Sequence, residues 1–521
     1  MFLFVPSLLL GCTGSGGAEY TLQLTPLVAS PQTPFEDLER IDLVLTPADG
    51  EPLRVPLDGA TSGTTPEVTG LPPLANTRIT VEGYRDGEIV MRGRTEPLTA
   101  SSGVVEATVF IASTEATAWL GALDVGLYHP MLAPLGEGRF WLGGGATNNR
   151  ANEPGKGQDL AYTLSLAPPG ADLSFVAATS LPAYLDSDAV PTTERTGATC
   201  TRLTVTGEDA GKLLITGGAA SDPLQFDGQA SSASSLYDPA TDTWEDLPAM
   251  QGMQEPRVGH IALENVLGNV VIWGGLGATN RENQTNLPNT VEVYERATGK
   301  FTGGEVLADI GQLDALIADL GTEGTLICGG AAIDGSAWSS SDACSRVTLD
   351  GSAADAFESL PRGLAGAASA TLPDGRVLVT GGATATDALV DESIDAVASA
   401  WLYNPTTEQW GSLAQTMNIP RVGHRMVALA DGRVLIIGGA QTYNVTMPAE
   451  DPVSCLEIYD PTDGTFTSVD GCEATDDSGG LLAPTQLVQA AYDPDYGVLI
   501  VGGIGADGSA QDGVSLFVPS P

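Results

Sequence analysis

The sequence has few basic residues and very few histidines. Lysine and arginine together number 22 against 66 aspartates and glutamates, histidines number 3, and the formal net charge is −44. Contacts to nucleic-acid phosphates and to anionic lipid headgroups both need lysine and arginine, so this charge argues against both kinds of partner. It favours a secreted protein that its own acidity keeps soluble.

Long apolar runs are missing as well. Phe2–Leu10 is apolar but too short to span a bilayer as a helix, and residues 1–12 are typical of a signal peptide. The run ends in Leu9-Leu10-Gly11-Cys12, which resembles the bacterial lipobox. The resemblance implies a lipid on Cys12 and a flexible tether over residues 13–18. The expected localisation is the bacterial cell envelope, at the outer membrane or cell surface, with the lipid as the only membrane attachment. The run departs from the pattern in that no Lys or Arg precedes it. A plain secretory signal is the alternative.

Helical patterns are nearly absent, whereas turn-forming residues are abundant. The chain has 64 glycines and 34 prolines, and 42% of its residues are hydrophobic, which is a globular composition. Residues 19–113 contain short apolar or alternating runs, such as Ile41–Leu45 and Arg78–Tyr84, with turns at Asp49-Gly50 and Asp86-Gly87. We expect this segment to form an immunoglobulin-like β-sandwich.

The rest of the chain repeats one pattern. A short apolar run that ends in two glycines occurs at intervals of roughly 50 to 75 residues, which suits four short strands and their loops. Tight-turn pairs such as Asp431-Gly432 precede most runs, so each run is predicted to be the second strand of a hairpin. The pairs are Gly143-Gly144, Gly217-Gly218, Gly274-Gly275, Gly329-Gly330, Gly381-Gly382, Gly438-Gly439 and Gly502-Gly503.

A second pattern follows four of these runs. A tyrosine leads into a turn, and an aromatic residue comes seven residues later on the returning chain. This predicts a second hairpin and therefore four antiparallel strands per unit. The pairs are Tyr237 and Trp244, Tyr294 and Phe301, Tyr403 and Trp410, and Tyr459 and Phe466.

Together these patterns resemble kelch repeats, which carry a diglycine after an apolar strand, a tyrosine before a turn and a tryptophan beyond it. The resemblance covers residues 115–521 and implies a seven-bladed kelch-type β-propeller, similar to the central domain of galactose oxidase. The whole chain is expected to be all-β. The last unit lacks a fourth strand, and we expect Trp119, upstream of the first unit, to complete it and to close the ring.

The six cysteines suit an exported protein. With Cys12 assigned to the lipid, two pairs fall within single units and are candidates for disulfides between neighbouring strands. Cys200 is left over and is interpreted as a buried free thiol. The candidate pairs are Cys328 with Cys344 and Cys455 with Cys472.

Each histidine precedes its diglycine by 14 residues, which suggests one repeat position seen three times. The stretch Pro-Arg-Val-Gly-His occurs twice, and two further arginines stand in what look like decayed copies of it. One hypothesis is a ring of Arg and His side chains at the mouth of the central channel that binds an anion or an acidic group. The alternative, which we favour, is a repeated structural task, in which these side chains bind backbone carbonyls of neighbouring blades. The candidate residues are Arg195, Arg257, His260, Arg362, Arg421, His424 and His129.

No catalytic residue, metal ligand set or cofactor is predicted. HExxH and CxxC patterns are absent, and the histidines belong to different units. Galactose oxidase uses copper with His, Tyr and a Cys–Tyr crosslink, and no matching constellation can be assigned here. The predicted loops between second and third strands are long and acidic, so calcium stays open as an alternative, although no DxDxDG loop occurs. These acids are Asp222, Asp227, Asp387, Asp391, Glu392, Asp395, Glu450 and Asp451.

We therefore expect a non-catalytic scaffold that binds a protein or a glycan through the long-loop face of the propeller. Long loops on a rigid framework are where binding residues concentrate. The alternative is an extracellular enzyme, galactose-oxidase-like or glycan-processing, with its site at the channel mouth. Stoichiometric transition metal in the purified protein favours the enzyme, and a metal-free protein with a saturable partner favours the scaffold.

Overall fold

The computed structural model describes residues 3–521, with gaps at 5–7, 14–18, 29–33, 58–72, 101–102, 148–155, 167–173, 186–190, 221–229, 248–251, 278, 281–283, 286, 308, 446–450, 470–480 and 482–484. The described residues contain many short strands and no α-helix, which confirms the all-β prediction. Among these residues, no helix is long and apolar enough to cross a membrane.

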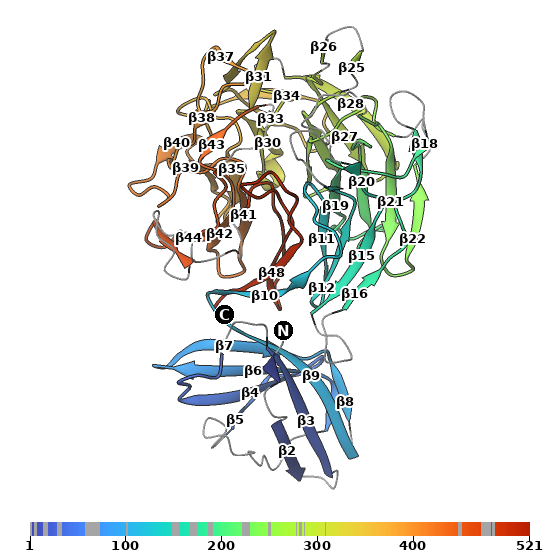
Figure 1. Ribbon diagram of the computed structural model, residues 1–521, viewed down its shortest axis with the longest axis vertical. Coiled ribbons are helices and arrows are strands. Elements are labelled where there is room, and N and C mark those ends of the chain that lie inside the picture. Colours follow the sequence, from blue (N-terminus) through green and yellow to red (C-terminus); the bar gives the residue numbers. More distant parts are fainter. Residues whose placement is uncertain are drawn as a thin grey trace.

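The N-terminal strands form one nine-stranded sheet, which lies at the bottom of Figure 1. Its order is β1-β3-β9-β7-β6-β4-β5, with β2 on β3 and β8 on β6, and β3 runs parallel to β9. The hydrogen bonds join all these strands into one sheet, whereas an immunoglobulin-like sandwich has two. The immunoglobulin-like arrangement therefore stays a prediction. The strands are β1 (Leu3–Phe4), β2 (Leu8–Thr13), β3 (Glu19–Val28), β4 (Arg40–Pro47), β5 (Leu53–Pro56), β6 (Leu74–Arg85), β7 (Glu88–Arg94), β8 (Leu98–Ala100) and β9 (Gly103–Ser113).

Seven four-stranded antiparallel sheets follow, numbered here from first to seventh. They are β11 (Met131–Gly136), β12 (Arg139–Gly143), β15 (Ala161–Ser165) and β16 (Ser174–Ala177); β19 (Thr199–Arg202), β20 (Leu213–Thr216), β21 (Ser234–Asp238) and β22 (Thr243–Asp246); β23 (Ile261–Glu264), β24 (Val270–Trp273), β27 (Thr290–Glu295) and β28 (Lys300–Val306); β29 (Leu316–Asp319), β30 (Thr325–Cys328), β33 (Cys344–Val347) and β34 (Ala354–Phe357); β35 (Ala368–Thr371), β36 (Val377–Thr380), β39 (Ala400–Asn404) and β40 (Gln409–Ser412); β41 (Arg425–Ala428), β42 (Val434–Ile437), β44 (Glu457–Asp460) and β45 (Thr465–Ser468); and β46 (Gln489–Asp493), β47 (Gly497–Val501), β48 (Gly513–Val518) and β10 (Ala116–Ala122).

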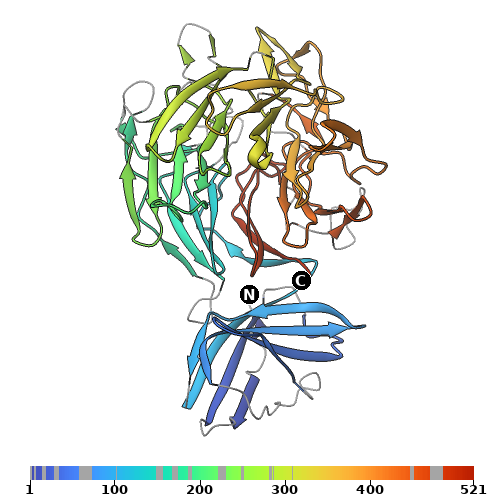
Figure 2. The ribbon, with the colours of Figure 1, turned by 180° about the vertical axis from the view of Figure 1, so that it is seen from behind.

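The sheets are arranged in a ring. The first strand of each sheet contacts the first strand of the next, in the cyclic order β11, β19, β23, β29, β35, β41, β46 and back to β11. Figures 1 and 2 show this arrangement from both sides. As predicted, the strand of Trp119 completes the last sheet: β10 pairs with β48, and Trp119 lies opposite Ser515. The sheet thereby joins the two ends of this part of the chain, and the fold is β-propeller-like.

Small sheets lie in the loops between second and third strands, except for one that lies in the connection from the first four-stranded sheet to the second. They occupy the top of Figure 1, at the end of the ring away from the N-terminal sheet. Their strands are β13 (Ala146–Thr147) with β14 (Lys156–Gly157), β17 (Tyr184–Leu185) with β18 (Pro191–Thr192), β25 (Thr279–Asn280) with β26 (Gln284–Thr285), β31 (Ala331–Asp334) with β32 (Ala337–Ser340) and β37 (Ala388–Leu389), and β38 (Ile394–Asp395) with β43 (Thr442–Tyr443).

The diglycines let neighbouring sheets touch through their backbones. A Cβ on Gly217 would lie 2.3 Å from the carbonyl oxygen of Arg257 in the next sheet, so a side chain is excluded there. The second glycine, Gly218, donates its N–H to the same carbonyl at 2.8 Å. Gly503 donates in the same way to Leu127 at 2.8 Å, which joins the seventh sheet to the first. The predicted role of the glycines, close approach of backbones, is therefore confirmed.

The predicted tyrosine hairpins are also present. Tyr237 lies directly opposite Trp244, and their ring centroids are 4.8 Å apart. The other three pairs occupy the same register between third and fourth strands, with centroids 4.9 to 5.3 Å apart. Aromatic pairs at this separation stabilise cross-strand packing beyond the area they bury.

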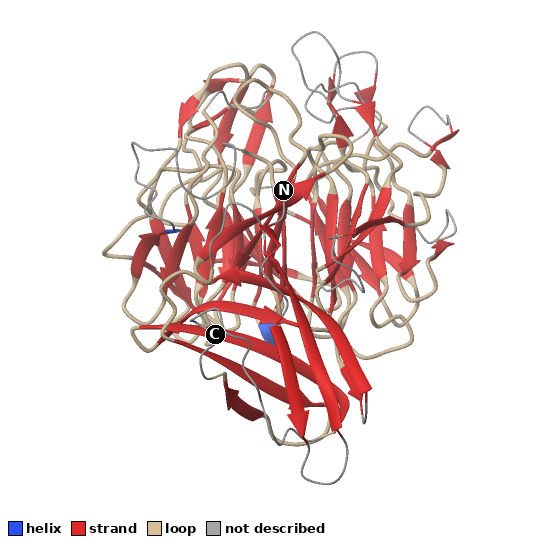
Figure 3. Ribbon diagram, turned by 60° about the horizontal axis from the view of Figure 1, so that its bottom comes forward, coloured by secondary structure: helices blue, strands red, loops and turns tan. Residues whose placement is uncertain are grey.

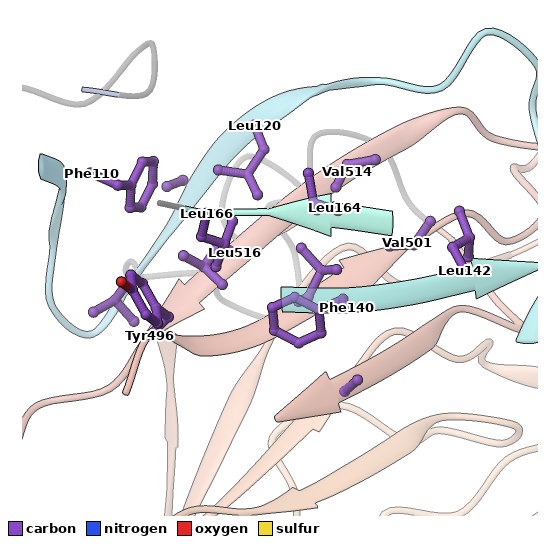
Figure 4. Close-up of a cluster of buried hydrophobic side chains, with 14 of the residues drawn as sticks. Phe110, Leu120, Phe140, Leu142, Leu164, Leu166, Tyr496, Val501, Val514 and Leu516 are labelled. Carbon is purple, nitrogen blue, oxygen red and sulfur yellow. The ribbon is translucent and has the colours of Figure 1, made fainter. Parts of the chain in front are cut away.

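The N-terminal sheet packs against the turns between first and second strands of the ring. Phe110 of β9 belongs to the same buried cluster as Leu120 and Tyr496 (Figure 4). Arg94 and Arg78 both form ion pairs with Asp495, which lies in the turn between β46 and β47. First-to-second turns and second-to-third loops leave opposite ends of antiparallel strands, so the N-terminal sheet and the long loops lie on opposite faces of the ring (Figure 3).

One of the two predicted disulfides is present in full. Cys328 and Cys344 form a disulfide between β30 and β33. Cys455 is disulfide-bonded, whereas Cys472 lies outside the described residues, so their pairing stays a prediction. Cys200 is a free thiol, and burial raises its pKa well above the ordinary range. Cys12 lies in β2, paired with β3 in the uncleaved chain, and its lipidation stays a prediction.

Candidate functional site

The repeated arginines are buried and bind their own sheet. The Arg257 guanidinium donates from Nε to Glu292 at 3.0 Å and from Nη1 to the carbonyl oxygen of Gly274 at 3.0 Å. Arg421 makes the equivalent bonds, from Nε to Glu457 at 3.2 Å and from Nη1 to the carbonyl oxygen of Gly438 at 3.0 Å. Each arginine thus ties the start of the first strand to the diglycine and to the third strand of the same sheet.

These contacts correct the channel-mouth hypothesis for the repeated arginines. Arg195, Arg257 and Arg421 are 0% exposed, so a ligand in the channel cannot touch them. The Arg195 guanidinium lies 4.5 Å from the centroid of the Tyr184 ring, in a cation–π contact. Arg362 is exposed, unlike the others. Arg257 and Arg421 do bind backbone carbonyls, as the structural alternative expects, but these carbonyls belong to their own sheet and not to a neighbouring blade.

His260 and His424 are buried between sheets. His260 Nε2 lies 2.9 Å from Thr216 Oγ1 in the preceding sheet, and His424 Nε2 lies 2.8 Å from Thr380 Oγ1 in the same way. Burial, and after it a neighbouring arginine charge, lower the pKa of both imidazoles to about 3. Both rings are therefore neutral at pH 7 and act as packing groups.

His129 does not share this position, which corrects the counting from the sequence. The first sheet has three consecutive glycines, and the two with positive φ are Gly144 (61°) and Gly145 (90°). Gly143 ends β12. Counted from Gly144, His129 stands 15 residues upstream of its diglycine, one position before the place that His260 and His424 occupy.

In every sheet of the ring, the residue equivalent to His129 has a left-handed backbone conformation. It follows an isolated β-bridge that leads into the first strand, at the loop end of the ring. Four sheets have glycine there, and three have a residue with a side chain. The φ values are 62° for Gly197, 69° for Gly259, 65° for Gly366, 64° for Gly423, 48° for His129, 51° for Asp314 and 57° for Leu487.

Side chains in this conformation are strained by about 1–3 kcal/mol, and such strain gathers at functional sites. The backbones of this ring of residues also bind one another across sheets. Gly366 donates its N–H to the carbonyl oxygen of Asp314 at 2.9 Å, and Gly423 donates to that of Gly366 at 2.8 Å. The exceptions to glycine therefore stand in a ring of hydrogen-bonded backbones at the loop end of the first strands, which we call the mouth.

Polar side chains meet at this mouth. Tyr443, from the loop of the sixth sheet, donates its hydroxyl to Asp314 Oδ2 at 2.7 Å. The Trp338 ring packs on the edge of Tyr443, with centroids 5.1 Å apart. Arg425, the first residue of β41, is exposed and donates from Nε to the carbonyl oxygen of Val488 at 3.2 Å. We call His129, Asp314, Arg425 and Tyr443 the mouth cluster.

The members of the mouth cluster influence one another electrostatically. Burial, and after it the charge of Arg425, lower the pKa of His129 to about 4. Restricted hydration raises the pKa of Asp314, while the hydrogen bond from Tyr443 and the charge of Arg425 oppose this rise. The cluster thus combines a cation, a carboxyl group, a phenol and a neutral imidazole.

The sequence interpretation missed Asp314, Arg425 and Tyr443. A signal for Asp314 exists, since it stands 15 residues before Gly329, where Gly259 and Gly423 stand before their diglycines. Nothing in the chain marks Tyr443, because its hydrogen bond joins residues 129 positions apart.

The described residues do not form a metal centre. Within them, no three His, Cys, Asp or Glu side chains come together closely enough to hold an ion. Asp222, Asp227 and Glu450, among the acids considered for calcium, lie outside the described residues.

The chain matches no family description and no curated protein. Among solved structures, it is similar to a fungal alcohol oxidase of the AA5 family in complex with copper, with a TM-score of 0.54 and 15% identity over 77% of this chain and 75% of the oxidase. It is also similar to YjhT, with a TM-score of 0.46 and 15% identity over 67% of this chain and 99% of YjhT. The similarity to the oxidase supports a galactose-oxidase-like fold and, at 15% identity, extends to the fold alone.

Proposed function

We propose that this chain is a non-catalytic binding protein of the bacterial cell envelope, in which a seven-bladed kelch-type propeller (115–521) carries the binding face. The seven four-stranded sheets and their cyclic contacts support this blade count. We further propose that residues 19–113 form a second, immunoglobulin-like domain, which lies between the propeller and the membrane.

The proposed anchor is a lipid on Cys12. The N-terminal sheet packs on the turn face of the ring, through Asp495 and the cluster around Phe110. An anchor on this side would hold the long-loop face away from the membrane. That orientation suits a protein that meets a partner outside the cell.

The observation that carries the proposal is the mouth cluster. Asp314 and Arg425 are exposed polar groups on a framework of buried, hydrogen-bonded repeats. Rigid scaffolds that present polar side chains at a central mouth hold them in one geometry without an ordering cost on binding. The ligand class in this proposal is a protein or a glycan of the cell surface.

The second candidate is an extracellular enzyme with its site at the same mouth. Its support is the fold similarity to the AA5 oxidase, together with the hydrogen-bonded Asp314–Tyr443 pair. The fold similarity fits both candidates equally well, because one fold hosts unrelated functions.

The test combines metal analysis with partner binding. The purified chain from Ala18 to Pro521, prepared without chelator, is assayed for bound metal and titrated with cell-envelope fractions and glycan arrays. Saturable binding by metal-free protein is the expected result. Stoichiometric copper, with loss of an oxidase activity in EDTA, contradicts the proposal and supports the enzyme.

A further inference from the structure

Arg425 presents donors that the protein leaves unused. Its Nε binds the carbonyl oxygen of Val488, which fixes the guanidinium over the seventh sheet. Among the described residues, its two terminal amino groups make no hydrogen bond, and the side chain is exposed. A guanidinium held in this way offers a planar pair of donors that matches a carboxylate.

Asp314 presents an acceptor. Tyr443 occupies Oδ2, and within the described part of the chain Oδ1 has no hydrogen-bond donor. The buried Tyr443 ring, packed against Trp338, holds the carboxyl group in one orientation. Oδ1 is therefore available to accept from a hydroxyl or an ammonium group of a ligand.

Glycines stand between these two groups along the mouth. In order around the ring, Asp314 is followed by Gly366 and Gly423, and Arg425 is two residues beyond Gly423. A Cβ on Gly366 would lie 2.5 Å from Val422 Cγ2, so this position stays without a side chain. The acceptor and the donors therefore face the mouth without an intervening side chain at the repeat position.

We infer that the mouth cluster binds a small ligand that carries one carboxylate beside a hydrogen-bond donor, with the carboxylate on Arg425 and the donor on Asp314. The inference rests on the proposed binding function and names the group that is recognised. A net charge of −44 repels ligands with many negative charges, which favours a single carboxylate over a polyanion. The donor is a hydroxyl in a sugar acid or an ammonium group in an amino acid.

Calorimetric titration of the full chain with two pairs of probes tests this inference. D-glucuronate is compared with D-glucose, and L-alanine with L-alaninamide, since each control lacks only the carboxylate. We expect one of the two acids to bind and its control not to bind. Arg425→Gln should weaken that binding by about tenfold or more. Arg376→Gln, which removes the same charge from a turn on the opposite face, should leave it unchanged.

The two acids distinguish a hydroxyl donor from an ammonium donor, because one is a sugar acid and the other an amino acid. Binding of either acid supports the inference. Binding that is equal in wild type and Arg425→Gln overturns it. An envelope partner that binds the wild-type chain, while neither acid binds, overturns the inference and leaves the proposed function intact. Acid binding with no envelope partner contradicts the proposed function but not the assignment of the site.

Discussion

One repeat position is occupied differently in two pairs of sheets: the third and sixth form one pair, and the first and fourth form the other. In the third and sixth, Gly259 and Gly423 hold the left-handed position, and the adjacent His260 and His424 are buried against the preceding sheet. In the first and fourth, His129 and Asp314 hold that position with strained backbones at the channel mouth. The comparison teaches that the repeated Arg and His side chains build the ring, whereas departures from the repeat supply the polar groups of the candidate site.

The largest expected effect is on the buried ion pair of the sixth sheet. Arg421→Leu leaves Glu457 buried without its cation, which costs about 3–5 kcal/mol of unfolding free energy. Arg376→Leu, at a more exposed pair with Asp374, should cost less than about 1 kcal/mol. Chemical denaturation measures both. Equal small losses would show that the repeated arginine does not stabilise the ring.

Removal of the disulfide in the fourth sheet should cause the next largest loss of unfolding free energy. This sheet has Gln312 at the position of Arg257 and carries the disulfide between Cys328 and Cys344, 16 residues apart in the chain. A loop of this length predicts about 3 kcal/mol of stabilisation. The double variant Cys328→Ala with Cys344→Ala should therefore unfold at lower denaturant, and reductant should reproduce the loss in the wild type. A wild type insensitive to reductant, with an unchanged double variant, contradicts this.

Acid should destabilise the ring through its buried histidines. The pKa of His260 and His424 is about 3 when folded, against about 6.5 in an unfolded chain, so the unfolded chain binds more protons between these values. Stability is then fully present above pH 6.5 and falls as the pH decreases toward 3. Between pH 6 and 5, each histidine contributes a loss of up to about 1.4 kcal/mol per pH unit. The double variant His260→Gln with His424→Gln should show a flatter pH dependence, measured by denaturation at each pH.

The smallest expected effect is at the strained positions. Asp314→Gly relieves the backbone strain but removes the hydrogen bond to Tyr443, so its unfolding free energy should change by less than about 1 kcal/mol. Gly366→Ala at the same repeat position should cost more, because φ is 65° and its Cβ would meet Val422. Thermal unfolding compares the two. A larger loss for Asp314→Gly would make Asp314 a structural residue.

Local patterns predict most of this fold because the repeat is local. Diglycines, tight turns and tyrosine–aromatic pairs each lie within one hairpin, and the pairing of Trp119 follows from counting strands. The site was less predictable. His129 was assigned to the wrong repeat position because three glycines in a row leave two possible registers. Tyr443 binds Asp314 across sheets, and the charge of Arg425 acts on Asp314 from another sheet, which no spacing within one repeat can reveal.

The central claim is tested most directly by partner binding in two double variants. One carries Asp314→Asn with Arg425→Gln at the mouth, and the other carries His260→Gln with His424→Gln in the buried repeat. In titrations with the same envelope fraction at pH 7, the mouth variant should lose binding by about tenfold or more. The repeat variant should bind as the wild type does while it remains folded. Full binding by the mouth variant, or selective loss in the folded repeat variant, would contradict the account.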